Sequence, residues 1–297
     1  MLTANIIDIK HLAVHDGPGI RTTVFFKGCT LRCNWCHNPE SQLGSTQLGL
    51  LENSCIKCKE CEKVCQYHSF VGNKHYINRK NCTLCGKCVT NCPVNALELY
   101  GKQVSLDTVF KEIIQDKVFF NNSCGGCTVS GGEPLLQSKF CKELFLKLKA
   151  ENIHTAVDTC GAVSWSAFED VIPFTDIFLL DLKHPNSIKH KEATALGNEQ
   201  ILSNLFNLDK CNKPIEIRIP LIPYYNSDEV SLAGFISILK QLKNLIGIKV
   251  LPFHKSRFKY QALGQEEILK DLDPCSDILA NSVKQYFCKN NITVLEN

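Results

Sequence analysis

The sequence has little net charge and lacks any long apolar run, and both absences narrow the classes of function. Its 297 residues carry 33 Lys and Arg against 30 Asp and Glu, a formal charge of +3. So small an excess, without a basic stripe, argues against a nucleic-acid or anionic-membrane partner. No apolar run approaches the roughly 20 residues of a membrane span, and residues 1–10 lack the apolar segment of a secretory signal. We therefore expect no membrane association and a reducing, anaerobic cytoplasm.

Cysteine, in contrast, is abundant and clustered. Eighteen cysteines occur, and eleven of them lie in three runs of C-x2-C and C-x3-C spacing. Disulfide frameworks are typical of small secreted proteins, whereas this chain is long and its apolar fraction of 44% is enough for a sizeable core. The clustering therefore favours metal or iron–sulfur binding over crosslinking.

The first run places three cysteines at C-x3-C-x2-C spacing within residues 27–40, directly after an apolar, β-branched run at residues 22–26. Thiolates suit iron–sulfur clusters or zinc, and a [4Fe–4S] cluster usually has four cysteine ligands. With only three in this loop, one iron would stay open for a substrate or cofactor, as a catalytic zinc keeps an open position. The alternatives are a zinc loop with a distant fourth ligand, or three buried core thiols. The three residues are Cys29, Cys33 and Cys36.

Residues 53–100 contain two further runs that repeat one pattern, C-x2-C-x2-C-x3-C. In bacterial two-cluster ferredoxins the fourth cysteine of each such run ligates the other cluster. Gln66 stands where proline is usual in the first run, which removes no ligand. A pair of four-cysteine zinc sites is the alternative, although zinc ligand pairs normally have longer spacers. Because so short a segment has a small apolar core, the clusters would have to crosslink the segment and so stabilise its fold. The pattern assigns one cluster to Cys55, Cys58, Cys61 and Cys92, and the other to Cys82, Cys85, Cys88 and Cys65.

The rest of the chain alternates strands with helices, which predicts a parallel sheet with right-handed crossovers. Six strands should start near residues 22, 127, 154, 177, 215 and 247, two fewer than a full (β/α)8 barrel needs. Helical spacing marks residues 109–118, 135–150, 165–171, 231–243 and 276–289, and a last short strand is expected at residues 292–295. Polar or glycine residues follow the C-terminal end of every main strand, the rim that carries active sites in β/α barrels.

Trp35 before the last loop cysteine makes that loop resemble the cluster loop of radical S-adenosylmethionine (radical SAM) enzymes. The flanking residues 14–22 and 37–41 resemble the activating enzymes of glycyl radical enzymes more narrowly. The resemblance implies an α/β fold: a partial (β/α)6 radical SAM barrel formed by residues 1–52 and 101–297. Residues 53–100 would be an inserted dicluster ferredoxin-like domain. The turn at residues 16–19 would lie at the mouth of the active site.

By the same resemblance, rim residues would bind SAM. Gly131, Gly132 and Glu133 would hold its amino group, because glycines admit a ligand closely and a carboxylate suits an ammonium; a simple turn that caps a helix is the alternative. The remaining expected contacts are Trp35, Cys36, His37, Asp158, Asp181, Leu182, Lys183, Arg218 and His254.

Several of these contacts have plain structural alternatives. Lys183, counted as catalytic with the three loop cysteines, would meet the SAM carboxylate or a partner's backbone, unless it only pairs with an aspartate. Arg218 interrupts an apolar strand and needs a partner, either SAM or a structural carboxylate. His254 could be an ordinary structural histidine, and Trp35 could simply pack in the loop. Asp158 also resembles a monovalent-cation site of some family members.

Two departures from the family concern cysteines. Cys124 and Cys127 stand where glycine, small or apolar residues are usual, which raises the hypothesis of a further metal. We favour no metal there, because two thiolates are too few and no partner pair is near in the sequence. Cys160 replaces asparagine or a small residue and would line the pocket without a role.

The resemblance implies an oxidoreductase that acts on a protein. SAM would bind the open iron, one electron would split it into methionine and a 5′-deoxyadenosyl radical, and the radical would take hydrogen from a backbone glycine of a partner glycyl radical enzyme. Two insert clusters, making three [4Fe–4S] clusters in all, would relay electrons from a flavodoxin or ferredoxin. A monomer is expected. The rival hypotheses are a radical SAM enzyme for a small molecule or cofactor precursor, a non-catalytic ferredoxin-type carrier, and a zinc-dependent nucleic-acid binder, which the low charge opposes.

Overall fold

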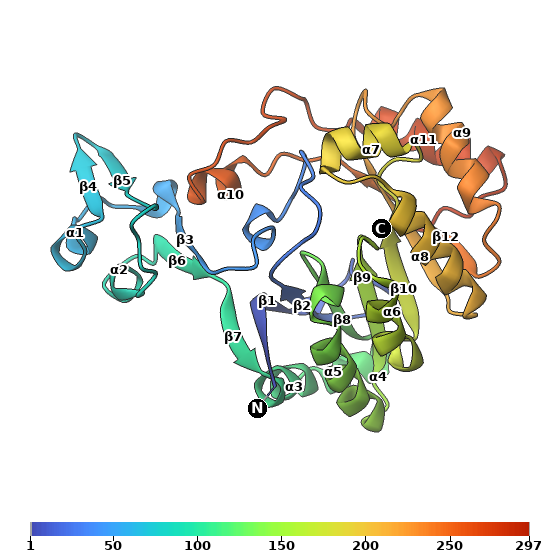
Figure 1. Ribbon diagram of the computed structural model, residues 1–297, viewed down its shortest axis with the longest axis horizontal. Helices are drawn as coiled ribbons and strands as arrows, with labels where there is room; N and C mark the ends of the chain where they lie inside the picture. The colour runs from blue at the N-terminus through green and yellow to red at the C-terminus, as the bar shows by residue number, and fades with distance from the viewer. Residues whose placement is uncertain (1, 297) are drawn as a thin grey trace.

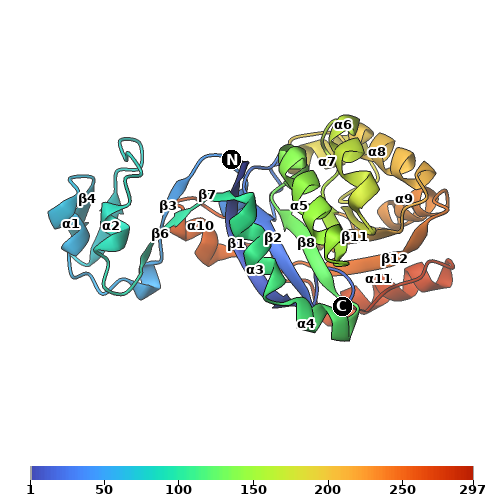
Figure 2. The ribbon, with the colours of Figure 1, turned by 90° about the horizontal axis from the view of Figure 1, so that it is seen from below.

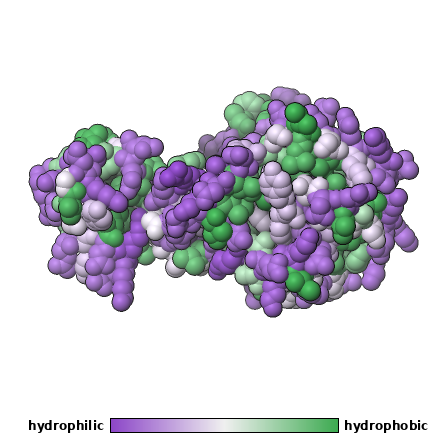
Figure 3. Space-filling view, turned by 90° about the horizontal axis from the view of Figure 1, so that it is seen from above, coloured by the Kyte–Doolittle hydropathy of each residue, from purple (hydrophilic) through white to green (hydrophobic). Residues whose placement is uncertain are grey.

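The computed structural model of the protein describes residues 2–296 and has a large and a small lobe (Figure 1). The large lobe is built on an eight-stranded sheet, and the small lobe comprises residues 47–100. Figure 3 shows a narrow waist between the lobes and a surface on which hydrophobic residues lie in small, separate patches. Within the described residues, no helix is long and apolar enough to cross a membrane.

Six parallel strands form the centre of the large sheet, and each begins within two residues of its predicted start. Consecutive strands pair directly, so the sheet follows the order of the chain and stays open at its edges. All their carboxyl ends therefore meet along one rim. The strands are β2 (Arg21–Phe26), β8 (Gly126–Gly131), β9 (His154–Thr159), β10 (Ile177–Asp181), β11 (Ile215–Leu221) and β12 (Leu245–Pro252).

Two antiparallel strands that the sequence reasoning did not anticipate extend this sheet. β1 (Thr3–Ala13) pairs with β2, and β7 (Lys102–Ser105) pairs with β1. Because β7 follows the small lobe directly, the chain leaves the sheet after β2 and returns to its edge before the first helix of the large lobe. The expected strand at residues 292–295 is wrong, since only an isolated bridge joins Ile248 to Val294.

Helices connect the parallel strands, and α3, α5 and α6 pack side by side (Figure 2). The predicted helix at residues 109–118 is instead two helices, because Asp116 lies at their junction and its carboxylate accepts hydrogen bonds from Thr22 and His11. Two helices between β10 and β11, α7 and α8, were not predicted. The helices of the large lobe are α3 (Leu106–Ile114), α4 (Lys117–Ser123), α5 (Ser138–Ala150), α6 (Trp165–Val171), α7 (Ser187–Thr194), α8 (Glu199–Lys210), α9 (Glu229–Leu239), α10 (Arg257–Ala262) and α11 (Asp277–Lys289). Short 3-10 helices lie at η1 (Pro39–Ser41), η3 (Pro134–Gln137) and η4 (Ile172–Phe174).

The small lobe consists of two short hairpin-like sheets and two single-turn helices. Its own core is a small cluster of buried leucines and the thiols of Cys61 and Cys88. So little apolar burial cannot stabilise an independent domain of this size without further crosslinks. Its elements are β3 (Gln47–Leu50), η2 (Glu52–Ser54), α1 (Glu60–Val64), β4 (His68–Val71), β5 (Lys74–Ile77), α2 (Lys87–Thr90) and β6 (Leu97–Tyr100), with β3 paired to β6 and β4 to β5.

Candidate functional site

The three-cysteine loop leaves the carboxyl end of β2 and is held mainly by backbone hydrogen bonds. Gly28 N–H donates to Ser41 O at 2.8 Å, which closes the loop on itself. Arg32 N–H donates to the carbonyl of Thr194, at the end of α7, at 2.8 Å. The loop is therefore fixed to both neighbouring parts of the rim, although it contains only the short helix η1.

A cavity of about 250 Å3 opens beside this loop at the carboxyl ends of the strands. It brings together residues from all six parallel strands or the segments that follow them, as the rim pattern predicted. Of the expected site residues, the cavity is lined by Cys29, Cys33, Trp35, Cys36, His37, Gly131, Gly132, Asp158, Asp181, Lys183 and Arg218.

Glu133, Leu182 and His254 are the expected contacts that do not line this cavity within the described residues. The carboxylate of Glu133 is fully buried and accepts hydrogen bonds from Leu135 N–H at 3.0 Å, from Cys160 N–H at 2.9 Å, and from the Thr159 hydroxyl at 2.9 and 2.8 Å. Glu133 therefore ties β8 to the turn after β9 and does not face the cavity.

The turn at residues 16–19 lies before β2, at the opposite end of that strand from the cysteine loop, and does not line the cavity within residues 2–296. Arg218, which lines the cavity, donates to His15 O at 2.9 Å, directly before the turn, so the expected place of the turn at the mouth stays a prediction. The buried Arg21 holds the turn through a 2.9 Å hydrogen bond to Pro18 O.

Two ion pairs set the charge of the cavity wall. Lys183 Nζ lies 2.6 Å from Asp181, and Arg218 Nη1 lies 3.4 Å from Asp158. Burial raises the pKa of Asp158 to about 6, although Arg218 opposes the shift. Burial lowers the pKa of Lys183, but the charges of Asp181 and Cys33 outweigh it and hold that pKa well above its ordinary value. The cavity wall thus offers both cationic and anionic groups to a zwitterionic ligand.

The loop thiols differ in their ease of ionisation. A hydrogen bond with the Cys160 thiol lowers the pKa of Cys29, whereas burial raises the pKa of Cys33 to about 12 and also that of Cys36. Cys160 lines the same cavity, as expected for it. The three loop thiols line one cavity and therefore fit a [4Fe–4S] cluster held by three cysteines. The charges of both signs beside them fit a charged organic ligand.

The glycines of β8 allow this wall to form. Gly132 N–H donates to Phe26 O at 2.9 Å, and Glu133 N–H donates to Gly28 O at 2.7 Å. A Cβ on Gly132 would lie 2.2 Å from Gly28 O, a contact that would force the two segments apart. Close approach of the β8 end to the cysteine loop therefore requires glycine at this position.

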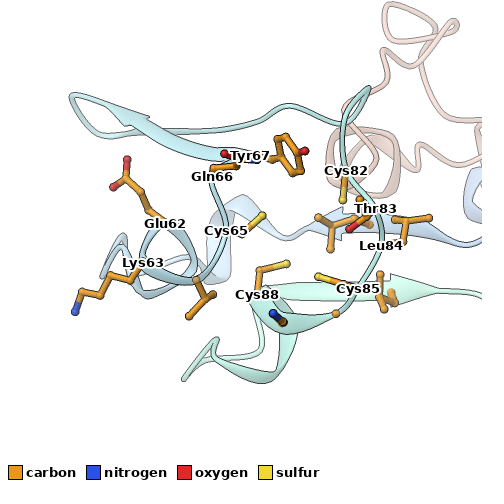
Figure 4. A pocket seen from close by; sticks show the side chains of 15 residues that line it. Glu62, Lys63, Cys65, Gln66, Tyr67, Cys82, Thr83, Leu84, Cys85 and Cys88 are labelled. Carbon is orange, nitrogen blue, oxygen red and sulfur yellow. The ribbon is translucent and has the colours of Figure 1, made fainter.

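The small lobe gathers its eight cysteines into two groups, in the crossed combination that the spacing predicted. Cys65, Cys82, Cys85 and Cys88 line a cavity of about 490 Å3, and Figure 4 shows their sulfur atoms directed toward one another. The other four cysteines, Cys55, Cys58, Cys61 and Cys92, line a second pocket.

Two buried histidines accompany only the second of these pockets, and the sequence reasoning missed them. His75 Nδ1 lies 3.8 Å from Cys55 Sγ, and its Nε2 lies 3.6 Å from Cys61 Sγ and 2.8 Å from His68 Nδ1. Burial lowers the pKa of His68 to about 4 and also lowers that of His75, which favours neutral imidazoles. In the sequence both histidines lie between the two cysteine runs, in the segments that form the paired strands β4 and β5, and this position was the available indication.

The Cys124 and Cys127 thiols lie in different surroundings. Cys127 is fully buried on β8, and burial raises the pKa of its thiol to about 12, while Cys124 is exposed. The absence of a metal at this pair stays a prediction.

Comparisons with known proteins agree with this geometry. The Radical SAM superfamily model matches residues 23–236. The chain is 39% identical to the (2S)-3-sulfopropanediol dehydratase activating enzyme of Klebsiella oxytoca, over 90% of this chain and 87% of that protein. It is 38% identical to the choline trimethylamine-lyase activating enzyme of Oleidesulfovibrio alaskensis, over 92% and 91% of the two chains.

Among solved structures, a radical SAM methyltransferase from Sphaerobacter thermophilus shares the fold with a TM-score of 0.57 at 11% identity, over 98% of this chain and 76% of that one. The matching family model, the extent of the similarity to activating enzymes and the three-cysteine rim cavity agree: the chain belongs to the radical SAM superfamily and, within it, to the activating enzymes of glycyl radical enzymes.

Proposed function

We propose that this protein generates a glycyl radical on one specific partner enzyme, using SAM bound in the 250 Å3 rim cavity. The observation that carries the proposal is that Cys29, Cys33 and Cys36 line the same cavity as the charged ends of β9, β10 and β11. A cluster held by three cysteines and a zwitterionic ligand can therefore occupy adjacent positions in one site.

The roles of the cavity residues follow from their charge and position. Lys183 and Arg218 would attract the carboxylate of SAM, and Asp158 or Asp181 would attract its ammonium. Each of these side chains would then either leave its present ion-pair partner or contact that partner and SAM together. Gly131 and Gly132 would let the ligand approach the backbone. We place the monovalent cation suggested by the family resemblance beside Asp158.

When bound, the cluster and SAM supply the radical chemistry: one electron cleaves a carbon–sulfur bond of SAM, and transfer of a hydrogen atom from the partner's glycine yields methionine, 5′-deoxyadenosine and a glycyl radical. The chain's own residues must then hold the ligand in place and keep water from the reacting atoms. Trp35, which is 7% exposed, and the buried Phe253 line the cavity and provide that apolar cover.

We further propose that residues 53–100 form a ferredoxin-like insert with two [4Fe–4S] clusters, within a radical SAM unit made of residues 1–52 and 101–297. The crossed grouping of its eight cysteines supports this assignment, and so does its small apolar core. The clusters would relay electrons from a flavodoxin or ferredoxin. Because thiolate-bound clusters need a reducing compartment, we place the monomeric protein in the cytoplasm.

The class of partner follows from the relatives. Their names include activating enzymes for a dehydratase, a carbon–nitrogen lyase and a decarboxylase. We propose a partner of this general kind, a glycyl radical enzyme that presents an extended glycine-containing loop to the rim.

The test is SAM cleavage by anaerobically reconstituted, reduced protein. Cys29→Ala, Cys33→Ala and Cys36→Ala should each abolish formation of 5′-deoxyadenosine, because each removes one of only three thiolate ligands. Cys211→Ala is the matched control, since Cys211 is an exposed thiol on the far end of α8. Retained cleavage in all three loop variants would contradict the assignment. A glycyl radical signal by electron paramagnetic resonance on a co-purified partner would identify the substrate.

A further inference from the structure

The short helix α10 contacts both lobes at once, although it lies more than 150 residues after the small lobe in the chain. Figure 1 shows it between β3 and the cysteine-loop region. On the large-lobe side, the Tyr260 hydroxyl donates to Cys36 O at 3.0 Å. Lys259 Nζ lies 2.8 Å from Glu40 and 2.7 Å from Asn38 Oδ1. One face of α10 is therefore attached to the three-cysteine loop itself.

The other end of α10 is attached to the small lobe through hydrogen bonds of the Arg79 side chain. Its Nη2 donates to Ala262 O at 2.8 Å, and its Nη1 donates to Leu48 O on β3. Arg79 O in turn accepts from Cys82 N–H, at 3.4 Å. Both Leu48 and Cys82 line the 490 Å3 cavity. Arg79 thus connects α10 to one of the two cysteine groups, and to the wall that encloses it.

These contacts span a short distance. Tyr260 and Ala262 are two residues apart on a six-residue helix, which is about 9 Å long at 1.5 Å per residue. Tyr260 is 5% exposed and Arg79 is half-buried, and burial lowers the pKa of Arg79 and raises that of Tyr260. A hydrogen-bonded chain therefore runs from the Cys82 loop through α10 to Cys36.

We propose that α10 is a bridge that fixes the Cys65, Cys82, Cys85 and Cys88 group beside the three-cysteine loop, and that this group is the last to hold the electron before the rim cavity. The inference rests on the proposed function of the insert. One electron passes from the cluster of this group, which is oxidised, to the cluster of the loop, which is reduced; a flavodoxin or ferredoxin restores it. Arg79 and Tyr260 act as positioning residues, because neither ligates a cluster.

The test compares two reductants on the complete, reconstituted protein. Reduced flavodoxin, a protein, must deliver its electron at the surface, whereas photoreduced deazaflavin is small enough to reach the rim cavity. The double variant Arg79→Gln with Tyr260→Phe should slow flavodoxin-driven 5′-deoxyadenosine formation at least about tenfold, since the part-buried hydrogen bonds that join the small lobe to α10, and α10 to the cysteine loop, are lost. The rate with deazaflavin should stay within about twofold of the wild type.

Matched controls and a second variant separate positioning from misfolding. Arg257→Gln, at the exposed start of α10, and Tyr224→Phe, on the surface, should leave both rates unchanged. Gly264→Ala should reproduce the flavodoxin defect without altering the insert, because its Cβ would lie 2.7 Å from Arg79 Nε in a residue with φ of +68°. Iron and sulfide content and the electron paramagnetic resonance intensity of the reduced clusters should match the wild type in every variant.

The possible outcomes are distinct. Wild-type rates with flavodoxin in a fully loaded double variant would overturn the bridge, and so would an equal loss with both reductants, which would place the defect in the rim cavity. Failure of the wild type to cleave SAM with either reductant would instead overturn the proposed function.

Discussion

The structure assigns Glu133 a role that can be measured, namely to hold the end of β9 in place and not to bind the ammonium of SAM. In Glu133→Gln one carboxylate oxygen becomes an amide NH2, which cannot accept a hydrogen bond. Because Oε1 accepts from Leu135 N–H and Oε2 from Cys160 N–H, one of these buried donors must face another donor. An unsatisfied buried donor costs about 1–3 kcal/mol.

Glu133→Ala removes the acceptor for three donors, the third being the Thr159 hydroxyl. The loss would be about 3–9 kcal/mol if the terms added. Burial raises the pKa of Glu133, so its charged form is itself unfavourable in the fold, and we expect a loss near the lower end, about 3 kcal/mol.

Anaerobic guanidinium unfolding of the reconstituted protein measures these losses, with exposed Glu143→Gln on α5 as the control. Isothermal titration with SAM gives the second readout. If Glu133→Gln left the free energy of unfolding unchanged while SAM affinity fell, Glu133 would be a ligand-binding residue and the structural reasoning would be refuted.

Four further predictions concern the two sites. Gly132→Ala should weaken SAM binding at least about tenfold by titration calorimetry, because its Cβ clashes with the cysteine loop; Gly44→Ala, which meets no atom within 4 Å, should not. Asp158 has a pKa of about 6 against an ordinary 3.8, so its contribution to stability is complete below pH 3.8 and is lost as pH rises through 6. Between pH 4 and pH 7 the free energy of unfolding of the wild type should therefore fall by up to about 3 kcal/mol relative to that of Asp158→Asn. Anaerobic thermal unfolding at a series of pH values measures this difference. Cys160→Ala should keep the iron content and SAM binding, whereas loss of iron would make it a fourth cluster ligand. His75→Leu should lower the midpoint potential of one insert cluster in a redox titration, since an N–H donor near its sulfurs is lost; unchanged potentials would refute this.

The local sequence pattern was enough to locate the six parallel strands. Each strand is a short apolar run that is bounded by turn residues and followed by polar or glycine residues. It failed for β1, a strand next to the edge of the sheet in which only Ala4, Ile6 and Ala13 are buried. It failed for α7 as well, whose residues are mostly polar and do not form an apolar face. The spacing of Ile201, Leu205 and Leu208 in α8 did carry a readable helical signal.

The candidate site divides in the same way. The residues that motifs place at strand ends meet in one cavity, because parallel strands bring their carboxyl ends together. The direction of a side chain is not fixed by its motif. Glu133 turns inward because Thr159 and Cys160, 26 and 27 residues later, offer three hydrogen bonds to its carboxylate. The contact of Tyr260 with Cys36 spans 224 residues and depends entirely on tertiary packing.

The two cysteine runs of the insert look equivalent in the sequence, yet the fold makes their surroundings different. One group contains the buried imidazole of His75 within hydrogen-bonding range of its sulfurs, and the other lies beside Arg79 and through it contacts α10. Hydrogen bonds and solvent exposure are the factors that tune cluster potentials within one ligand type. Under the proposed assignment, two clusters with identical ligands would therefore differ in potential. Figure 1 shows β4 and β5, which carry the two histidines, farther from α10 than β3 is, so the proposed electron path would run from the histidine-flanked group to the group beside Arg79.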